Sequence, residues 1–554
     1  MSNLHTVHAL GRGNSNGWLG TGLEWKGQED EVSYNIEEIR LKLLDLSKTC
    51  YIIHKNGAYG AVNKGQICQK GGMADIMAVL PPVDYRLLGD SSFLECYGVD
   101  FPYMAGSMAH GISSVEMVRA LGRNKILSSF GAGGLSLDKI EAAIREIQKE
   151  NIPYAFNLIH SPAVEGLEER TIELYLKYNV SVIEASAFMK ITPALVLYRA
   201  AGLEKDLKGG IVIKNKIIAK VSRREIAEMF LKPAPKEMLK LLVEEGKITD
   251  LQASMAEKVP MADDLTAEAD SGGHTDNRPM TCLLPSILQL RDSLHKTYKY
   301  KYPVRVGMAG SIGTPGAALS AFLMGASYIV TGSLNQSCIE AGTSEHTKNL
   351  VSQAGYADVM MAPSTDMFEV GVKVQLLKKG TFFPMRAEKL YELYRSYNSI
   401  EEIPSEERMK IEKQIFRKSL DEVWDETEAF FKIKDPSQIQ KAKANPKRKM
   451  ALIFKWYLGK ATHWSTAGEK GREFDYQIWC GPSIGAFNDW VRNSYLVDSS
   501  TRGVVDVVKH IMLGTAYLYR IKDLRMAGIS LPEELTGYYP QREYIDFVNM
   551  GYKS

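Results

Sequence analysis

The stretch of residues 262–279, ADDLTAEADSGGHTDNRP, holds the side chains best suited to chemistry. It begins with the alternation of apolar and polar residues that is typical of a β-strand, and it ends in a polar loop where Gly272 and Gly273 precede His274. A helical pattern starts at Thr281, so the loop joins a strand to a helix. Ligands of α/β proteins bind beside such loops. We therefore expect His274, which can act as acid or base near neutral pH, at the chemical centre; the alternative is a histidine that only orders the turn.

Two small-residue turns further along the chain predict a phosphate site. The segment GMAGSIGTPGAA, residues 307–318, follows an apolar strand and opens a helix in which Thr314 suits the N-cap and Pro315 the first helical position. The next strand ends in TGS, residues 331–333. Two such turns after the seventh and eighth strands form the usual phosphate cradle of barrel enzymes, whereas one alone would indicate an ordinary tight turn.

Two more polar residues stand at the ends of predicted strands. Asn157 lies in FNLIHSP and Lys220 lies in IIAKVS. Asn157 can hydrogen-bond a planar heterocycle, and its alternative role is that of a turn former. A lysine that points into a barrel needs an anionic or hydrogen-bonding partner, because an unpaired buried charge is costly, and this favours contact with a ligand.

Three further motifs have simpler explanations. FGAGGLS, residues 130–136, lacks the full GxGxxG spacing of a dinucleotide-binding loop, which favours a structural turn. GPSIG, residues 481–485, matches the GxSxG nucleophile elbow around Ser483, but only His510 follows it, which favours a chance match. The basic run KAKANPKRK, residues 441–449, is typical of a solvated surface and alternatively suits an acidic protein partner.

Strand-like segments alternate with helical stretches through the middle of the chain, and they position these residues. The eight strand-like segments are PYMAGSM, ILSSFGAGG, YAFNLIHSP, VSVIEASAF, KIIAKV, the 262–279 stretch, VRVGMAGSIG and YIVTGS. Such alternation predicts a parallel sheet, and eight units favour an α/β fold of the TIM (β/α)8 barrel type over a doubly wound open sheet. We predict an N-terminal cap or linker segment over residues 1–90, the barrel over 91–380 with a helical insertion near 236–257, and a mostly helical lid or subdomain over 381–554.

Charge and cysteine content exclude several classes of protein. The 68 basic and 66 acidic residues leave a formal charge of +2, so no global field favours nucleic acid or an anionic membrane. The six cysteines form no CxxC pair, which suits a reducing compartment. The sequence has no cluster of His and Cys residues that would predict a metal site. The N-terminus lacks the features of a signal peptide, and no apolar run approaches the roughly 20 residues that span a bilayer. We therefore expect a cytoplasmic protein.

The ordered series of motifs resembles the trans-acting FMN-dependent enoyl reductases of trans-acyltransferase polyketide synthases and polyunsaturated fatty acid synthases, a branch of the nitronate monooxygenase-like barrels. The segments that carry the resemblance are MAGSMAHGISS, FGAGGLS, FNLIHSP, EASAFMKITPALVLYRAAGL, EADSGGHTDNRP, GMAGSIGTPGAALSAFLMGASYIVTGS, MAPSTDMFEVGVKVQLLKKGTFFPMRAEKLYELYR and DYQIWCGPSIGAFNDWVRNSY. The histidine loop reads EADSGGH where simpler members of the superfamily read EAGGH, and the longer form favours the polyketide-type branch.

The resemblance implies an FMN-binding barrel and three groups of site residues. Those that would face the flavin ring or hold its phosphate are Ala105, Gly106, Met108, Asn157, Lys220, Gly273, Gly310, Gly332 and Ser333. The implied catalytic residue is His274, which matches the active-site histidine of the superfamily. Those offered to the substrate or the nicotinamide are Asn277 and Arg278.

The implied reaction reduces the α,β-double bond of an enoyl chain on the phosphopantetheine of an acyl carrier protein, within a polyketide synthase complex. NADPH or NADH reduces FMN, which passes hydride to the β-carbon while a proton reaches the α-carbon. The first alternative is a nitronate monooxygenase-like flavin oxidase, which the long C-terminal region disfavours because a small free substrate needs no such extension. A hydrolase or acyltransferase using Ser483 and a binding scaffold without chemistry are the others.

Overall fold

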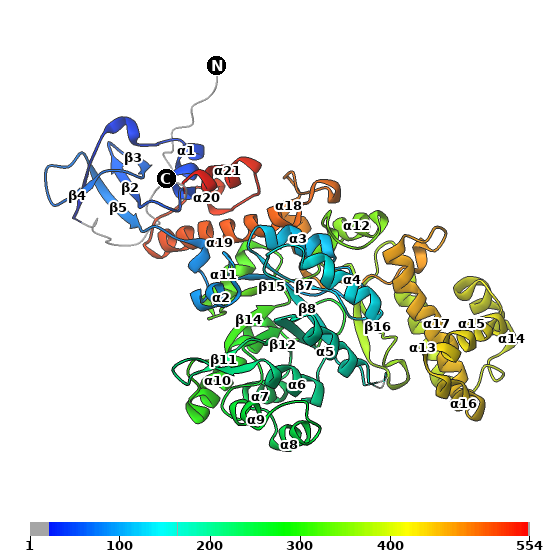
Figure 1. Cartoon of the computed structure of the whole chain (residues 1–554). Helices are drawn as coiled ribbons and strands as arrows, with labels where there is room; N and C mark the ends of the chain where they lie inside the picture. Colours follow the sequence, from blue (N-terminus) through cyan, green and yellow to red (C-terminus); the bar gives the residue numbers. More distant parts are fainter. Residues whose placement is uncertain (1–21, 163, 165, 552–554) are drawn as a thin grey trace.

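The computed structural model describes residues 22–162, 164 and 166–551. Eight parallel strands form a closed barrel at its centre, in the order β12-β13-β14-β15-β6-β7-β8-β9 (Figure 1). The strands are β6 (Tyr103–Ala105), β7 (Leu127–Phe130), β8 (Ala155–Ile159), β9 (Val182–Ser186), β12 (Lys216–Val221), β13 (Asp264–Glu268), β14 (Arg305–Ala309) and β15 (Ile329–Thr331). The predicted barrel is confirmed, and the open doubly wound sheet is wrong. The prediction that the N-terminus is not a signal peptide concerns residues that lie outside the described range.

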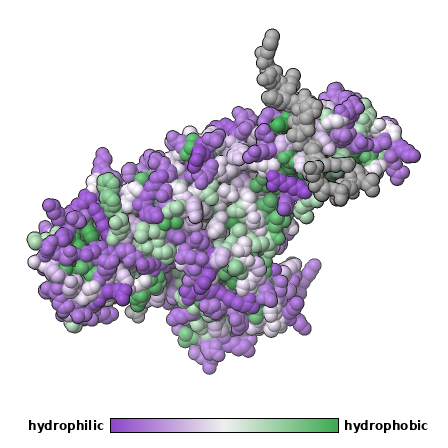
Figure 2. Space-filling view, turned by 180° about the vertical axis from the view of Figure 1, so that it is seen from behind, coloured by the Kyte–Doolittle hydropathy of each residue, from purple (hydrophilic) through white to green (hydrophobic). Residues whose placement is uncertain are grey.

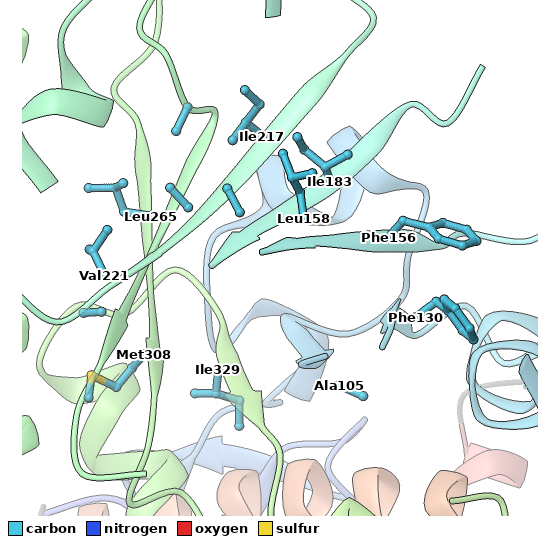
Figure 3. Packing of buried hydrophobic residues seen from close by; sticks show 14 of the residues in the cluster. Ala105, Phe130, Phe156, Leu158, Ile183, Ile217, Val221, Leu265, Met308 and Ile329 are labelled. Carbon is cyan, nitrogen blue, oxygen red and sulfur yellow. The ribbon is translucent and has the colours of Figure 1, made fainter. Parts of the chain in front are cut away.

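Alternate residues of each strand pack against a surrounding layer of helices. Figure 3 labels one or more of these residues from every strand of the barrel: Ala105, Phe130, Phe156, Leu158, Ile183, Ile217, Val221, Leu265, Met308 and Ile329. The helices of this layer are α3 (Val115–Arg123), α4 (Leu137–Ile147), α5 (Leu167–Lys177), α6 (Pro193–Ala201), α7 (Arg224–Leu231), α10 (Met280–Tyr298) and α11 (Pro315–Leu323). Because strand side chains alternate between faces, the residues between these positions point into the barrel.

The end of the barrel where the strands begin is filled by side chains. Helix α2 (Ser91–Tyr97) places Phe93 against Tyr328, with ring centroids 4.3 Å apart. Beside them Asp264 accepts hydrogen bonds from Arg305 and from the Tyr97 hydroxyl. Burial raises the pKa of Asp264, and the adjacent guanidinium opposes this rise. A ligand therefore has only the opposite end of the barrel, where the strands finish, to enter.

Two additions interrupt the alternation around the fifth strand. A hairpin of β10 (Leu203–Lys205) and β11 (Ile211–Ile213) precedes β12 and was not predicted. The stretch where we expected a helical insertion holds α8 (Lys236–Glu244) and α9 (Asp250–Ala256). Thr249 starts α9 with a capping box, in which its side chain and that of Gln252 each pair with the other's backbone amide.

The described part of the N-terminal segment forms an antiparallel sheet of five strands beside the barrel. Its order is β3-β2-β5-β1-β4, made of β1 (Glu24–Lys26), β2 (Cys50–Lys55), β3 (Ala58–Val62), β4 (Gln66–Cys68) and β5 (Ala74–Leu80). One face packs against α1 (Ile36–Leu44) and the long helix α19 (Val504–Met526), with α20 (Glu533–Thr536) and α21 (Arg542–Gly551) nearby (Figure 1). The first and last described segments of the chain thus lie side by side.

The residues after the barrel divide between two places. Helices α13 (Phe383–Ser396), α14 (Ser405–Ile411), α15 (Leu420–Lys434), α16 (Pro436–Ala444) and α17 (Pro446–Ala467) form a body with its own apolar core. Helices α18 (Ser483–Val491) and α19 return to the barrel. No helix within the described residues is long and apolar enough to cross a bilayer, and polar residues predominate on the face in Figure 2.

Candidate active site at the mouth of the barrel

A ring of polar side chains lines the inside of the barrel where its strands end. It consists of Asn157 on β8, Glu184 on β9, Lys220 on β12 and Glu268 on β13, which alternate with outward-facing apolar residues. Lys220 Nζ lies 3.3 Å from Glu268 Oε1, and each side chain is 18% exposed. Burial alone would lower the pKa of Lys220, but the charges of Glu268 and Glu184 raise it above its ordinary value. Lys220 is therefore a cation held inside the mouth.

Asn157 is fixed within this ring by its own amide group. It is 4% exposed, and its Nδ2 donates to the Glu184 carbonyl and to Ser186 Oγ, each at 3.1 Å. Both partners belong to the neighbouring strand, so the side chain cannot turn without losing two hydrogen bonds. Asn157 and Lys220 thus share the inner face of the barrel, two strands apart, and their contact with a ligand stays a prediction.

Glu184 was not predicted as a site residue, and it is the most enclosed member of the ring. Its side chain is 1% exposed, and Oε2 accepts a hydrogen bond of 2.8 Å from the Ser107 amide. Oε1 has no hydrogen-bond partner among the described residues. An acidic residue inside the apolar run VSVIEASAF was the signal that could have identified it.

The loops after β14 and β15 form the predicted small-residue turns. Thr314 caps α11 by accepting a hydrogen bond of 3.3 Å from the Ala317 amide, and Pro315 follows it. A Cβ atom on Gly310 would lie 2.6 Å from the Ala269 carbonyl oxygen, whereas a Cβ atom on Gly332 would meet nothing within 4 Å. Gly310 therefore permits close packing of the loop, and Gly332 borders open space.

Several backbone amides of these two loops are available to a ligand. In the described part of the chain, the N–H groups of Ile312, Gly313, Gly332 and Ser333 donate to no protein acceptor. The Ser333 hydroxyl is already used, because it accepts a hydrogen bond of 2.9 Å from the Gly481 amide. Unsatisfied amides beside a helix N-terminus suit an anion such as a phosphate group.

His274 is held at the mouth by a segment that follows the barrel in sequence. Gly273 has a φ of +78° and exchanges hydrogen bonds of 3.0 and 2.8 Å with the backbone of Gln375. His274 Nε2 lies 3.2 Å from Asp366 Oδ2. Burial alone would raise the pKa of Asp366, but the hydrogen bond and the charge of His274 bring it down to about 2. His274 thus has a carboxylate partner, which the sequence did not reveal.

A two-stranded hairpin and a second loop cover the histidine loop. The hairpin consists of β16 (Val359–Pro363) and β17 (Lys373–Leu377), and Leu376 pairs with Trp479. A Cβ atom on Gly272 would lie 2.7 Å from the Cys480 Cα atom, so the two backbones are in contact. Trp479 also approaches His110, with ring centroids 5.9 Å apart. Burial lowers the pKa of His110 to about 4, which leaves this imidazole neutral at pH 7.

Asn277 and Arg278, which the resemblance implies for binding the substrate or the nicotinamide, lie at the outer edge of the histidine loop. Asn277 Nδ2 donates to Asp270 Oδ1 at 2.8 Å and to Gln375 Oε1 at 3.3 Å. Arg278 is exposed, and its carbonyl accepts a hydrogen bond from the Asp270 amide. The structure therefore gives Asn277 a role in shaping the loop and leaves the Arg278 guanidinium at the surface.

The end of β6 and the loop that follows it pack closely against the neighbouring strand and the helix-facing cluster. Ala105 is 0% exposed and packs with the helix-facing cluster, and Met108 packs against the same cluster. A Cβ atom on Gly106 would lie 2.9 Å from Val330 Cγ1. Strand alternation turns the Ala105 side chain outward, and the contact of Ala105 and Met108 with a flavin stays a prediction.

The other motifs receive structural roles. His510 lies between the hydroxyls of Tyr495 and Tyr538, at 2.9 and 2.7 Å, so it is not a base for Ser483. In the basic run, Lys447 donates to two backbone carbonyls, Arg448 pairs with Glu369, and Lys449 lies over the ring of Trp424. These internal contacts occupy the last three basic residues of the run, while Lys441 and Lys443 are exposed.

Comparison with known proteins places this architecture among biosynthetic enzymes. Residues 25–82 match the family described as fatty acid synthase subunit PfaD N-terminal domain, and residues 397–476 match the one described as acyl-carrier-protein S-malonyltransferase, inserted helical domain. A polyunsaturated fatty acid synthase protein of Thraustochytrium sp. is 47% identical over 504 residues, which are 89% of this chain and 33% of that protein. The polyketide biosynthesis protein PksE of Bacillus subtilis is 44% identical over 471 residues, which are 84% of this chain and 60% of that protein.

One solved structure matches over nearly its whole length. The enoyl reductase domain of MlnA, from the macrolactin biosynthesis cluster of Bacillus amyloliquefaciens, is 41% identical with a TM-score of 0.76, and the match covers 80% of this chain and 99% of that domain. The two relatives are longer than this chain, which spans 33% of the first and 60% of the second. By its sequence and its barrel alike, the chain belongs to the family of enoyl reductases found in polyketide synthases and polyunsaturated fatty acid synthases.

Proposed function

We propose that this protein is an FMN-dependent enoyl reductase, which uses NADPH or NADH to reduce the α,β-double bond of an enoyl thioester on an acyl carrier protein. The observation that carries the proposal is the similarity to the enoyl reductase domain of MlnA over 99% of that domain. The polar ring and the unsatisfied loop amides lie at the open end of the barrel, where such a reaction needs them.

The residues present fit FMN. The amides of Gly332 and Ser333, with those of the β14 loop, suit its phosphate, and the open space beside Gly332 leaves room for it. Lys220 and Asn157 offer a cation and an amide to the polar edge of the flavin ring. When bound, FMN supplies the two-electron chemistry, taking hydride from the nicotinamide and giving it to the β-carbon.

His274 is placed to handle the proton. Asp366 accepts from Nε2 in the tautomer that this partner favours, which leaves Nδ1 for the substrate. There the protonated ring donates a proton to the α-carbon or hydrogen-bonds the thioester carbonyl, which are the roles of a positioned general acid. Asp366 supports the donor by holding the ring in one orientation.

The carrier-protein partner is supported by the relatives. Residues 397–476 match a helical domain described for an acyl-carrier-protein S-malonyltransferase, and the matched synthase proteins act in fatty acid and polyketide synthesis. Asn277 and Arg278, at the outer edge of the histidine loop, are placed to meet a substrate or nicotinamide as it approaches rather than the reacting atoms.

Anaerobic turnover with an enoyl chain on its carrier protein tests the proposal. We expect the bound chain to gain two hydrogens by mass analysis when FMN and a reduced nicotinamide are supplied. Flavin that is reoxidised only by oxygen would support the nitronate monooxygenase-like oxidase instead. A protein that binds no flavin would contradict both redox functions.

A further inference from the structure

The floor of the barrel mouth holds more negative than positive charge. Lys220 Nζ lies 3.3 Å from Glu268 Oε1. The charges of Glu268 and Glu184 both raise the pKa of Lys220. Glu184 itself makes no salt bridge with any described residue, although it is 1% exposed. One cation thus faces two carboxylates in an enclosed site, where water screens their charges poorly.

The free oxygen of Glu184 lies inside the barrel, next to Gly106. Oε2 is anchored by the Ser107 amide at 2.8 Å, and Oε1 lies 3.5 Å from the place that a Cβ atom on Gly106 would occupy. Gly106 directly follows the end of β6, so Oε1 stands at the height where the strands finish. A buried carboxylate oxygen without a hydrogen bond is costly, and a ligand that offers a donor there would satisfy it.

We propose that Glu184 contacts the flavin: Oε1 accepts a hydrogen bond from the ring N3–H or from a ribityl hydroxyl, and its negative charge lowers the reduction potential of the bound FMN. The inference rests on the proposed function and names a residue that it leaves unassigned. Reduction places negative charge on the flavin, and a neighbouring carboxylate opposes this. A lower potential makes the reduced flavin a stronger reductant toward the enoyl chain.

The charge is tested by the holoprotein with Glu184→Gln. We expect its FMN midpoint potential, measured by equilibration with a reference dye, to become more positive. Equivalently, the affinity for reduced FMN relative to oxidised FMN should rise by about tenfold, because one partly screened charge has been removed. Glu184→Asp, which keeps the charge but shortens the reach, should weaken FMN binding while retaining most of the low potential.

A matched control removes a buried carboxylate outside the mouth. Glu168, in the first turn of α5, is 8% exposed and pairs at 2.6 Å with Nδ1 of His160, the residue that follows β8. Glu168→Gln should leave the flavin potential unchanged. If the Glu184→Gln protein kept the wild-type midpoint potential, the inference that the charge of Glu184 lowers that potential would be overturned.

The contact is tested without any substitution. Apo wild-type protein should bind N3-methyl-FMN or 2′-deoxy-FMN several-fold more weakly than FMN, and the analogue that loses affinity identifies the donor. Equal affinity for FMN and for analogues that lack each candidate donor would overturn the contact. The negative results are an unchanged potential in Glu184→Gln and equal affinity for the analogues. If either is found while the wild-type protein binds and reduces FMN normally, this inference alone is rejected and the proposed function stands.

Discussion

The pairing of His274 with Asp366 is the central feature of the site at the scale of single residues. The histidine comes from the loop after β13. The carboxylate comes from the segment between β16 and β17, and it lies 92 residues after the histidine in the sequence (366 − 274 = 92). A histidine held by a carboxylate keeps one tautomer and one orientation, as general acid catalysis requires. The pair therefore has consequences for both rate and stability.

The first prediction concerns rate. His274→Ala should lower kcat for enoyl reduction by about 10² to 10⁴, the usual contribution of a proton donor, while FMN stays bound. Asp366→Asn should cause a smaller loss of kcat and shift the pH profile, with KM little changed, because it alters the donor rather than substrate binding. Steady-state kinetics on a carrier-linked enoyl substrate measure both effects.

Asp276→Asn provides the matched control for Asp366→Asn. Asp276 lies two positions after His274, but it pairs with Arg223 at 2.8 Å and with Ser222 instead. Its substitution should leave the pH profile unchanged. An identical profile for Asp366→Asn would show that this carboxylate does not act through His274.

The second prediction concerns the dependence of stability on pH. The pKa of Asp366 in the folded protein is about 2, below the ordinary value of about 3.9 for an aspartate. Its contribution to stability is therefore present above pH 4 and is lost as the pH falls toward 2. Chemical unfolding between pH 3 and 6 should show the advantage of the wild type over Asp366→Asn shrinking as the solution becomes more acidic. A constant difference over this range would contradict the pairing.

At the scale of elements, the two loops proposed to bind the phosphate make opposite demands on their glycines. Gly310 has a φ of +76° and no room for a side chain, while Gly332 borders open space. Gly310→Ala should destabilise the protein by about 1–3 kcal/mol, through backbone strain and a clash with the Ala269 carbonyl. Gly332→Ala should leave the unfolding temperature nearly unchanged but weaken FMN binding, because its methyl group would enter the space beside the free amides.

Thermal unfolding of the apo proteins and FMN titration separate these two effects. The pair serves as its own control, because each variant adds the same methyl group to a neighbouring loop. If Gly332→Ala bound FMN as tightly as the wild type, the phosphate would have to lie elsewhere.

The elements that the sequence predicts well are those with a strong local pattern. Each barrel strand is an apolar run followed by a helical period, so β13 and the capped start of α11 could be placed from sequence alone. The five short strands near the N-terminus and the β16–β17 hairpin are not followed by such a period, and the N-terminal sheet also pairs distant segments such as β1 and β5. Local periodicity carries no information about such pairing.

The same distinction explains the site. Asn157 and Lys220 were found because a polar residue at the end of an apolar strand stands out. Asp366 and Gln375 could not be found, because their partners lie in a loop far away in sequence. Ala105 was assigned to the mouth by resemblance, but its place in the strand turns its side chain toward the helices. Assigning inward and outward faces requires the register of the whole barrel.

At the scale of the whole molecule, α19 joins the barrel to the N-terminal sheet. It packs with α11 and α3 of the barrel layer, and it also shares a buried cluster with α1 and β2. Its Arg520 is 0% exposed and lies near the C-terminal end of the helix. The guanidinium donates to the backbone carbonyls of Leu43, Asp45, Leu46, Lys48 and Pro81, at 2.6 to 3.4 Å. One side chain thus satisfies the turn between α1 and β2 and the chain that leaves β5.

The final prediction follows from this arrangement. Arg520→Met keeps much of the side-chain volume but leaves several buried carbonyls without donors, and it should destabilise the protein by roughly 3–5 kcal/mol. The loss should concentrate in the N-terminal sheet, since the barrel keeps its own core, and hydrogen exchange should show faster exchange in β2 and β5 than in β13. Arg525→Met on the same helix is the control, because Arg525 is exposed and its loss should change stability by less than about 0.5 kcal/mol. Equal effects of the two substitutions, or exchange that accelerates uniformly over the barrel and the sheet, would show that Arg520 does not join the two parts.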